Sequence, residues 1–139
     1  MRQNAGTDLQ MEEDSMTKIE KSLWGRKLQL KISFDCLEGE EVTASQKRAL
    51  NSLLDHWSGA EASLDAVKEY CEKNSGTQVQ AKNIGNVFRY VVPRSLFVMR
   101  EPEGCVAMMC DFRFDLEHGM AIVLRNGKLD RITDQDGVM

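Results

Sequence analysis

Long apolar runs, a strong excess of one charge and recognisable enzyme motifs are all missing from this chain of 139 residues. A transmembrane helix needs about 20 consecutive apolar residues, and no such run is present, so we expect no membrane partner. The polar N-terminus lacks the apolar stretch of a secretory signal peptide. The glycine patterns of phosphate- and dinucleotide-binding loops are absent, as is the nucleophile elbow of serine hydrolases. These absences exclude several common enzyme and membrane classes without indicating a function.

Charge is unevenly distributed along the chain. Residues 1–16 hold one basic and four acidic side chains, whereas the remaining residues hold 17 basic and 18 acidic ones. The body of the protein is therefore nearly neutral, although the whole chain carries a formal charge of -4. Nucleic-acid-binding domains concentrate positive charge and stack bases on aromatic side chains. Only 6% of these residues are aromatic and no basic cluster surrounds them, so we expect no nucleic-acid partner.

Cysteine and histidine form no standard metal or disulfide pattern. The four cysteines, at positions 36, 71, 105 and 110, include no C-x-x-C pair and do not resemble a secreted disulfide scaffold. We therefore expect a cytoplasmic protein, with Cys110 facing the core as a small hydrophobe. The two histidines, His56 and His118, have no zinc-binding spacing, so no metal and no cofactor is predicted. His56 is expected at the end of a helix, where its positive charge would favour the helix dipole.

The hydrophobic pattern predicts one domain behind a polar leader. Residues 1–17 are polar with no sustained period and are expected to be a mobile leader, with either Met1 or Met16 as the start of the protein. Residues 18–139 are long enough to bury a core and are predicted to form a single domain. Apolar and polar residues alternate from Leu28 to Phe34, which is typical of a strand with one wet face.

The middle of the chain has the spacing of helices. Apolar residues recur at i, i+3, i+4 and i+7 from Leu50 to Trp57, and the helical spacing resumes from Leu64 to Cys71. Thr43 and Gln46 match a capping box just before this region. The pattern predicts two helices, or one helix bent at Gly59, between about residues 43 and 74.

The last third of the chain has the pattern of strands. The turn at Asn126 and Gly127 is the strongest short hairpin signal, because both positions of the turn need a positive φ. We therefore predict an α+β fold: an antiparallel sheet of four to six strands, with a C-terminal meander and two central helices packed on one face. The residues predicted to form the core are Leu30, Ile32, Leu50, Leu53, Trp57, Leu64, Val67, Phe112, Ile122 and Leu124.

A cluster of polar residues follows the apolar run at 105–114. Five residues form the candidate binding site: Asp111, Arg113, Asp115, Glu117 and His118. Binding residues often occupy such corners, because a rigid sheet positions what the loop presents. A solvated strand face, with Arg113 balancing the acids, would have the same composition. Carboxylates beside an imidazole also suit a divalent cation or acid–base chemistry, but a metal site needs three or four convergent ligands.

The sequence from Phe112 to Lys128 resembles an uncharacterised bacterial domain family. The shared signature is an Asp-x-Glu-His-Gly corner, a strand, an Asn-Gly turn and a closing strand that ends near a Gln-Asp pair, here Gln135 and Asp136. Related domains occur in gene neighbourhoods that include immunity proteins of polymorphic toxins. The resemblance implies a small α+β protein of the bacterial cytoplasm that binds a partner, and no catalytic role is established for the motif.

Two functional hypotheses follow. The first is a non-catalytic protein that binds another protein, such as a cognate toxin, through its sheet face and acidic corner. The second is a metal-dependent or acid–base enzyme whose reactive groups are Asp111, Asp115, Glu117 and His118. The first is favoured, because the second lacks a complete set of ligands or a nucleophile.

Overall fold

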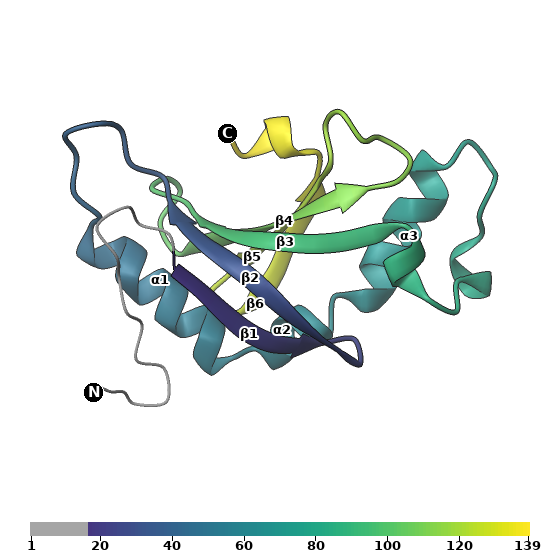
Figure 1. Cartoon of the computed structure of the whole chain (residues 1–139), viewed down its shortest axis with the longest axis horizontal. Helices are drawn as coiled ribbons and strands as arrows, with labels where there is room; N and C mark the ends of the chain where they lie inside the picture. The colour runs from purple at the N-terminus through teal and green to yellow at the C-terminus, as the bar shows by residue number, and fades with distance from the viewer. Residues whose placement is uncertain (1–16) are drawn as a thin grey trace.

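The computed structural model describes residues 17–139, which form a six-stranded sheet with helices packed against it (Figure 1). The predicted leader at 1–17 lies outside the described residues except for Thr17, the first residue of β1. The strands are β1 (Thr17–Leu23), β2 (Arg26–Phe34), β3 (Val91–Val98), β4 (Cys105–Phe112), β5 (Met120–Arg125) and β6 (Lys128–Thr133). The α-helices are α1 (Ala44–Asp55), α2 (Ser58–Glu61) and α3 (Leu64–Asn74). Short 3₁₀ helices are η1 (Ala81–Asn83), η2 (Val87–Arg89) and η3 (Gln135–Gly137).

The sheet confirms the predicted α+β class, and its strands lie side by side in chain order. Strands β3 to β6 form the predicted antiparallel meander, and β1 and β2 form a further antiparallel hairpin. The pair β2 and β3 is the exception, because these strands run parallel, with Ile32 opposite Leu96. Parallel neighbours need a long crossover connection. Residues 35–90 supply it and carry all three α-helices, so the expectation of a purely antiparallel sheet is wrong at this pair.

Strand β3 also differs from the sequence pattern. Pro93 interrupts the apolar run of this part of the sequence, but the structure has one continuous strand from Val91 to Val98. Proline cannot donate a hydrogen bond to a neighbouring strand, so sheets accommodate it at irregularities. Such an irregularity is present, because the pairing of β3 with β4 shifts between Pro93 and Ser95.

Helix α1 begins at the predicted capping box. The hydroxyl of Thr43 accepts a hydrogen bond from the backbone N of Gln46 at 3.0 Å, and the Gln46 side-chain oxygen accepts one from the backbone N of Thr43 at 2.9 Å. Gln46 is buried, and its Nε2 donates to the carbonyl oxygens of Asp35 and Val98. The cap therefore also ties the helix to the sheet. No helix within residues 17–139 is long and apolar enough to cross a membrane.

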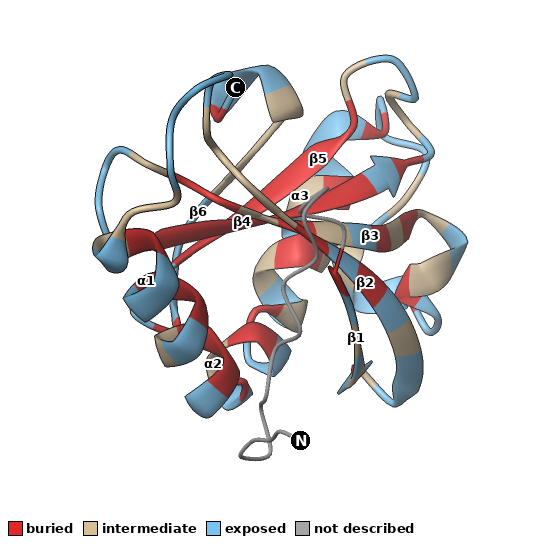
Figure 2. Cartoon of the chain, turned by 60° about the vertical axis from the view of Figure 1, so that its left-hand side comes forward, coloured by how far each residue is buried: buried red, intermediate tan, exposed pale blue. Residues whose placement is uncertain are grey.

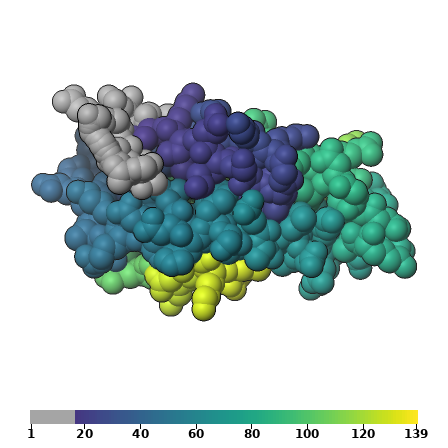
Figure 3. Space-filling view, turned by 90° about the horizontal axis from the view of Figure 1, so that it is seen from below, coloured from purple at the N-terminus to yellow at the C-terminus, as the bar shows by residue number. Residues whose placement is uncertain are grey.

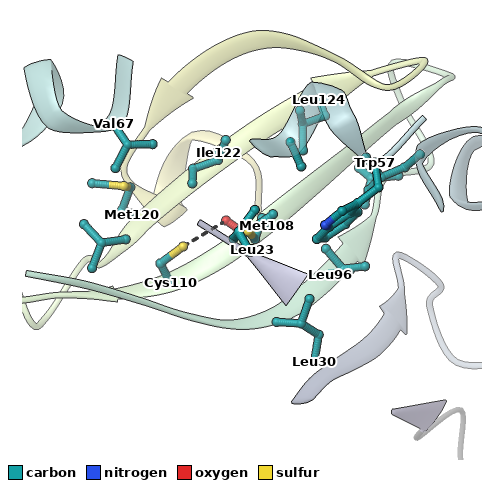
Figure 4. Packing of buried hydrophobic residues seen from close by; sticks show 14 of the residues in the cluster. Leu23, Leu30, Trp57, Val67, Leu96, Met108, Cys110, Met120, Ile122 and Leu124 are labelled. Atoms are coloured by element: carbon teal, nitrogen blue, oxygen red, sulfur yellow. Dashed lines mark hydrogen bonds between the residues drawn. The ribbon is translucent and has the colours of Figure 1, made fainter. Parts of the chain in front are cut away.

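The helices cover one face of the sheet, as predicted, and the main core lies between the two layers (Figure 2). In the space-filling view the helical segment forms a continuous layer across that face (Figure 3). Figure 4 shows side chains of the helices and strands converging in this core. Nine predicted core residues are buried: Leu30, Ile32, Leu50, Leu53, Trp57, Val67, Phe112, Ile122 and Leu124. Leu64 is only partly buried, because it lies in the first turn of α3 and packs on the edge of the cluster.

Strands β4 and β5 are buried on both faces, which the alternation in the sequence does not predict. Every residue from Cys105 to Cys110 is buried, and so is every residue from Met120 to Leu124. A second, smaller cluster is formed by residues of these strands together with Met99 and Val138; its members are Met99, Cys105, Ala107, Met109, Ala121, Val123 and Val138. The polar face of β4 therefore begins only at Asp111, next to the candidate site.

The β5–β6 hairpin has the predicted two-residue turn. Asn126 and Gly127 both have positive φ, 52° and 81°, as a type I′ turn requires. The turn packs against the joint between α1 and α2, where a Cβ on Gly59 would overlap the carbonyl oxygen of Gly127. His56 ends α1 as predicted and is exposed, with its Nδ1 2.9 Å from the carbonyl oxygen of Ser52. The close approach of Gly59 to Gly127 holds the helical layer against the end of the hairpin.

Candidate functional site

The turn between β4 and β5 is held in shape by its own hydrogen bonds. The backbone N of Asp115 donates to Phe112 O at 3.1 Å, and the backbone N of Gly119 donates to Asp115 O at 2.8 Å. The carboxylate of Asp115 accepts a further bond from the backbone N of His118 at 3.2 Å. An aspartate that accepts from nearby backbone amides stabilises a turn locally. We call residues 115–119, together with Gln135 and Asp136, the acidic corner.

The closing residues of the chain dock onto this turn. The backbone N of Gln135 donates to His118 O at 2.9 Å, and its Nε2 donates to Cys110 O at 3.0 Å. Gly119 makes room for that side chain: its φ is +64°, and a Cβ there would lie 2.5 Å from Gln135 Nε2 and 2.9 Å from Cys110 O. Glycine alone satisfies both the positive φ and the space. Gln135 and Asp136, the closing pair of the sequence signature, thus lie against its Asp-x-Glu-His-Gly segment.

The imidazole of His118 lies among three carboxylates. Its Nδ1 is 3.0 Å from Asp115 Oδ1, and its Nε2 is 3.8 Å from Glu117 Oε2 and 3.9 Å from Asp136 Oδ2. The hydrogen bond to Asp115 raises the pKa of His118 above its usual value of 6.5, and the surrounding negative charges add to the rise. In turn, the backbone hydrogen bond from His118 lowers the pKa of the Asp115 carboxyl. Both shifts favour the charged pair.

Aromatic side chains form the base of the corner. The rings of Tyr90 and Phe114 stack with centroids 5.3 Å apart, and Phe112 meets Phe114 edge-on at 5.7 Å. Tyr70 of α3 lies 5.5 Å from Phe112 and joins the helix to this cluster. Burial, together with the nearby carboxylates of Asp134 and Asp115, raises the pKa of Tyr70 above its usual value of 10.0. The residues just before Asp115 are therefore anchored by ring contacts.

The structure brings together three of the five predicted site residues and separates the other two. Asp115, Glu117 and His118 lie in the acidic corner. Asp111 instead pairs with Arg94 of β3, whose Nε lies 2.8 Å from Asp111 Oδ2. Arg113 is exposed and forms no ion pair with any residue in 17–139. Arg94, rather than Arg113, therefore balances the acid at the end of β4.

Two exposed residues of the corner are not among the predicted site residues. Asp136 reaches His118 from the far end of the chain, and only its place in the closing pair of the signature indicated it. Leu116 is 79% exposed beside Glu117. Nothing in the sequence distinguishes this leucine from the alternating apolar residues of a strand.

The corner holds acid–base groups without a complete metal or nucleophile set. Within the described part of the chain, no group of three or more His, Cys, Asp or Glu residues is arranged to hold a metal ion. Cys110 is buried and faces the core, as predicted, and its Sγ donates to Met108 O at 3.6 Å (Figure 4). Burial raises the pKa of the Cys110 thiol, which removes it as a thiolate nucleophile. The carboxylates of Glu117 and Asp136 are exposed, and the imidazole of His118 and the carboxylate of Asp115 are partly exposed.

The model of a domain family of unknown function, DUF6985, matches residues 7–139. The chain belongs to this family. The match includes every strand and helix of the structure, so the acidic corner is part of the DUF6985 domain itself. Membership of an uncharacterised domain family was predicted from the sequence and is confirmed. No curated protein and no solved structure matches the chain.

Proposed function

We propose that this DUF6985 domain binds another protein through its acidic corner and catalyses no reaction there. One observation carries the proposal: the corner's reactive groups are used to build a rigid turn. Asp115 accepts hydrogen bonds from both the backbone and the imidazole of His118, and the carbonyl of His118 holds Gln135. A turn fixed in this way presents its remaining side chains in one geometry, which lowers the entropy that binding a partner would otherwise cost.

The surface of the corner suits a basic partner. The side chains of Glu117 and Asp136 are 85% and 77% exposed, and Leu116, the residue before Glu117, is also exposed. Exposed carboxylates attract a positively charged surface and orient its approach, and an apolar side chain among them adds a small desolvated contact. We infer that the partner presents lysine or arginine side chains around an apolar recess.

The sequence resemblance narrows the class of partner. It relates this chain to domains that occur near immunity proteins of polymorphic toxins, so a cognate toxin is the proposed partner, and the cytoplasm is the proposed location. An immunity protein needs no catalytic group, because it acts by occupying the surface of the toxin. The rigid, charged corner supports that role.

Acid–base catalysis is a second candidate function, favoured by one detail. Asp115 holds Nδ1 of His118, which leaves Nε2 as the atom that would exchange a proton. The enzyme hypothesis also includes Asp111 among the reactive groups, and the structure disfavours this because Asp111 is paired with Arg94. A nucleophile or metal at the corner would have to come from elsewhere.

Binding of the protein encoded by the adjacent open reading frame tests the proposal. We expect it to bind the purified domain in isothermal titration calorimetry, and we expect Glu117→Lys to weaken binding by about tenfold or more. Glu61→Lys is the matched control, because Glu61 is an exposed acid of α2, which packs near the opposite end of β6. A product that does not bind, or that binds both variants equally well, would contradict the proposal.

A further inference from the structure

Strand β1 forms a regular, open edge of the sheet. All seven of its residues pair with β2 in register, and no other described strand pairs with its far side (Figure 1). The opposite edge, β6, is irregular, because its pairing with β5 shifts between Val123 and Leu124. A bulge of this kind protects an edge from pairing with another chain, whereas a regular edge presents unpaired N–H and C=O groups. Strand β1 is therefore the edge that a further strand can join.

Alternate residues of β1 direct their backbone groups away from β2. Leu23 adjoins the two-residue turn of the β1–β2 hairpin, so its backbone groups bond to β2 and those of Ser22 point away. The carbonyl oxygen of Ser22 accordingly accepts a hydrogen bond from Trp57 Nε1 at 2.8 Å. The backbone groups of Lys18 and Glu20 point the same way, and within residues 17–139 no hydrogen bond reaches them from that side. The open part of the edge therefore lies before Ser22.

The exposed side chains at these two positions have opposite charges. Lys18 forms no ion pair with any residue in 17–139, and it lies directly opposite Lys31 of β2, where like charges destabilise a sheet. Glu20 lies opposite Gln29, whose Nε2 donates to Glu20 Oε1 at 2.8 Å. The other carboxylate oxygen of Glu20 makes no hydrogen bond or ion pair within the described residues. Lys18 thus lacks a carboxylate neighbour, and Glu20 has an oxygen available for a cation.

We propose that two copies of this chain pair antiparallel through β1, with Lys18 of each copy opposite Glu20 of the other. This two-fold arrangement brings the outward backbone groups of both residues face to face, so that each Lys18–Glu20 pair exchanges two hydrogen bonds. On the face covered by the helices, the half-buried side chain of Ile19 meets Ile19 of the second copy. Lysine on an edge usually discourages pairing, but here the second copy supplies the carboxylate that Lys18 lacks.

Other registers of the same pairing are disfavoured. A slide of two residues in one direction puts Lys18 opposite Lys18, and in the other direction it puts Glu20 opposite Glu20. A further slide puts Glu20 opposite Ser22, whose carbonyl oxygen is held by Trp57. Opposite charges and open backbone groups coincide only in the proposed register. Strands β2 and β3 separate β1 from β4, so this surface does not depend on the function proposed for the acidic corner.

Sedimentation equilibrium of the full chain tests the proposal. We expect an increasing share of dimer as the concentration rises from micromolar to millimolar. Glu20→Lys and Lys18→Glu each make both cross-copy pairs repulsive, so each should weaken dimerisation by about tenfold or more. An equal mixture of these two variants should dimerise again, because each supplies the charges that the other lacks. Glu69→Lys, at an exposed acid of α3, changes the net charge as Glu20→Lys does and should leave dimerisation unchanged.

Amide hydrogen exchange shows whether β1 is the edge that pairs. The N–H groups of Lys18 and Glu20 should exchange rapidly in dilute solution and slowly in concentrated solution. Those of Ile19 and Lys21 point toward β2 and should be protected at both concentrations.

Four results would overturn the proposal. The first is a chain that stays monomeric at millimolar concentration, and the second is a dimer that neither Glu20→Lys nor Lys18→Glu weakens. The third is a mixture of the two variants that does not dimerise. The last is protection of the Lys18 and Glu20 amides that does not depend on concentration, which would make another segment of the same chain the occupant of the edge.

Discussion

Replacing Gly119 by alanine tests whether the C-terminal residues hold the acidic corner in shape. The new Cβ would lie 2.5 Å from Gln135 Nε2 and 2.9 Å from the carbonyl oxygen of Cys110. The side chain of Gln135 is flexible and must leave, whereas the oxygen belongs to the buried strand β4 and cannot move easily, so a close contact with it remains. The hydrogen bond between Gln135 and Cys110 is then lost.

The expected cost has two parts. An alanine held at positive φ costs about 1–2 kcal/mol, and the lost hydrogen bond costs about 0.5–1.5 kcal/mol. We therefore expect Gly119→Ala to lower the free energy of unfolding by at least about 1.5–3.5 kcal/mol, since the close contact with the Cys110 oxygen adds to these two parts. For a chain of this size each kcal/mol lowers the melting temperature by about 3–5 °C.

Urea denaturation measures this cost, and Gly76→Ala is the matched control. Gly76 has nearly the same φ, +66°, but a Cβ added there would have no atom within 4 Å. The control should therefore show only the conformational part, about 1–2 kcal/mol. In a Gln135→Ala background, Gly119→Ala should cost about 0.5–1.5 kcal/mol less than in the otherwise unchanged protein, because the hydrogen bond of Gln135 is already absent, while the contact with Cys110 O remains. If Gly119→Ala and Gly76→Ala cost the same in the otherwise unchanged protein, the docking of Gln135 does not support the corner.

Four further predictions concern stability and metal binding. Leu53→Ala should cost about 2–5 kcal/mol in urea melts, because Leu53 is buried in the core; a loss below about 0.5 kcal/mol would contradict that packing. Gly127→Val should cost about 2 kcal/mol or more, because a β-branched residue is strained at a φ of +81° and its Cβ would lie 2.6 Å from His56 Cβ. Near-normal stability of this variant would exclude the type I′ turn. His118→Gln should lower the free energy of unfolding most below about pH 6.5, because protonated His118 favours the native pair with Asp115. This loss should shrink as pH rises through the raised pKa of His118. Equal losses at about pH 5.5 and 8.5 would refute this pairing. Zn²⁺, Mn²⁺ and Ca²⁺ should not raise the melting temperature. A metal site, with the ion present at a hundred times its Kd, would stabilise the fold by about 2.7 kcal/mol. A rise in melting temperature that His118→Ala and Asp115→Asn both abolish would favour the hypothesis of a metal-dependent enzyme.

Local chemistry explains which elements could be predicted from the sequence. The capping box of Thr43 and Gln46 and the turn at Asn126 and Gly127 each depend on residues adjacent in the chain, and both occur as predicted. The parallel pairing of β2 with β3 depends instead on where a long crossover returns, which no short pattern encodes. Burial of β4 on both faces depends likewise on its central position in the sheet, between β3 and β5.

The candidate site was predictable to the extent that it is a single turn. Asp115, Glu117 and His118 are neighbours in sequence and in space, so their clustering follows from the chain. Asp111 points to a different partner because Arg94 faces it from the adjacent strand. Asp136 joins the corner only because η3 folds back onto it after β6, a contact between distant segments that the spacing of residues cannot show.

NMR mapping of the complex with the adjacent-gene product tests most directly the claim that the acidic corner is a protein-binding surface. With the chain isotope-labelled and the partner unlabelled, cross-saturation reports which amides of the chain lie at the interface. We predict that the saturated amides are concentrated at residues 115–119 and at Asp136, and that Glu117→Lys weakens this saturation at a partner concentration that does not saturate the variant. Saturation centred on another face, with the corner unaffected, would contradict the account.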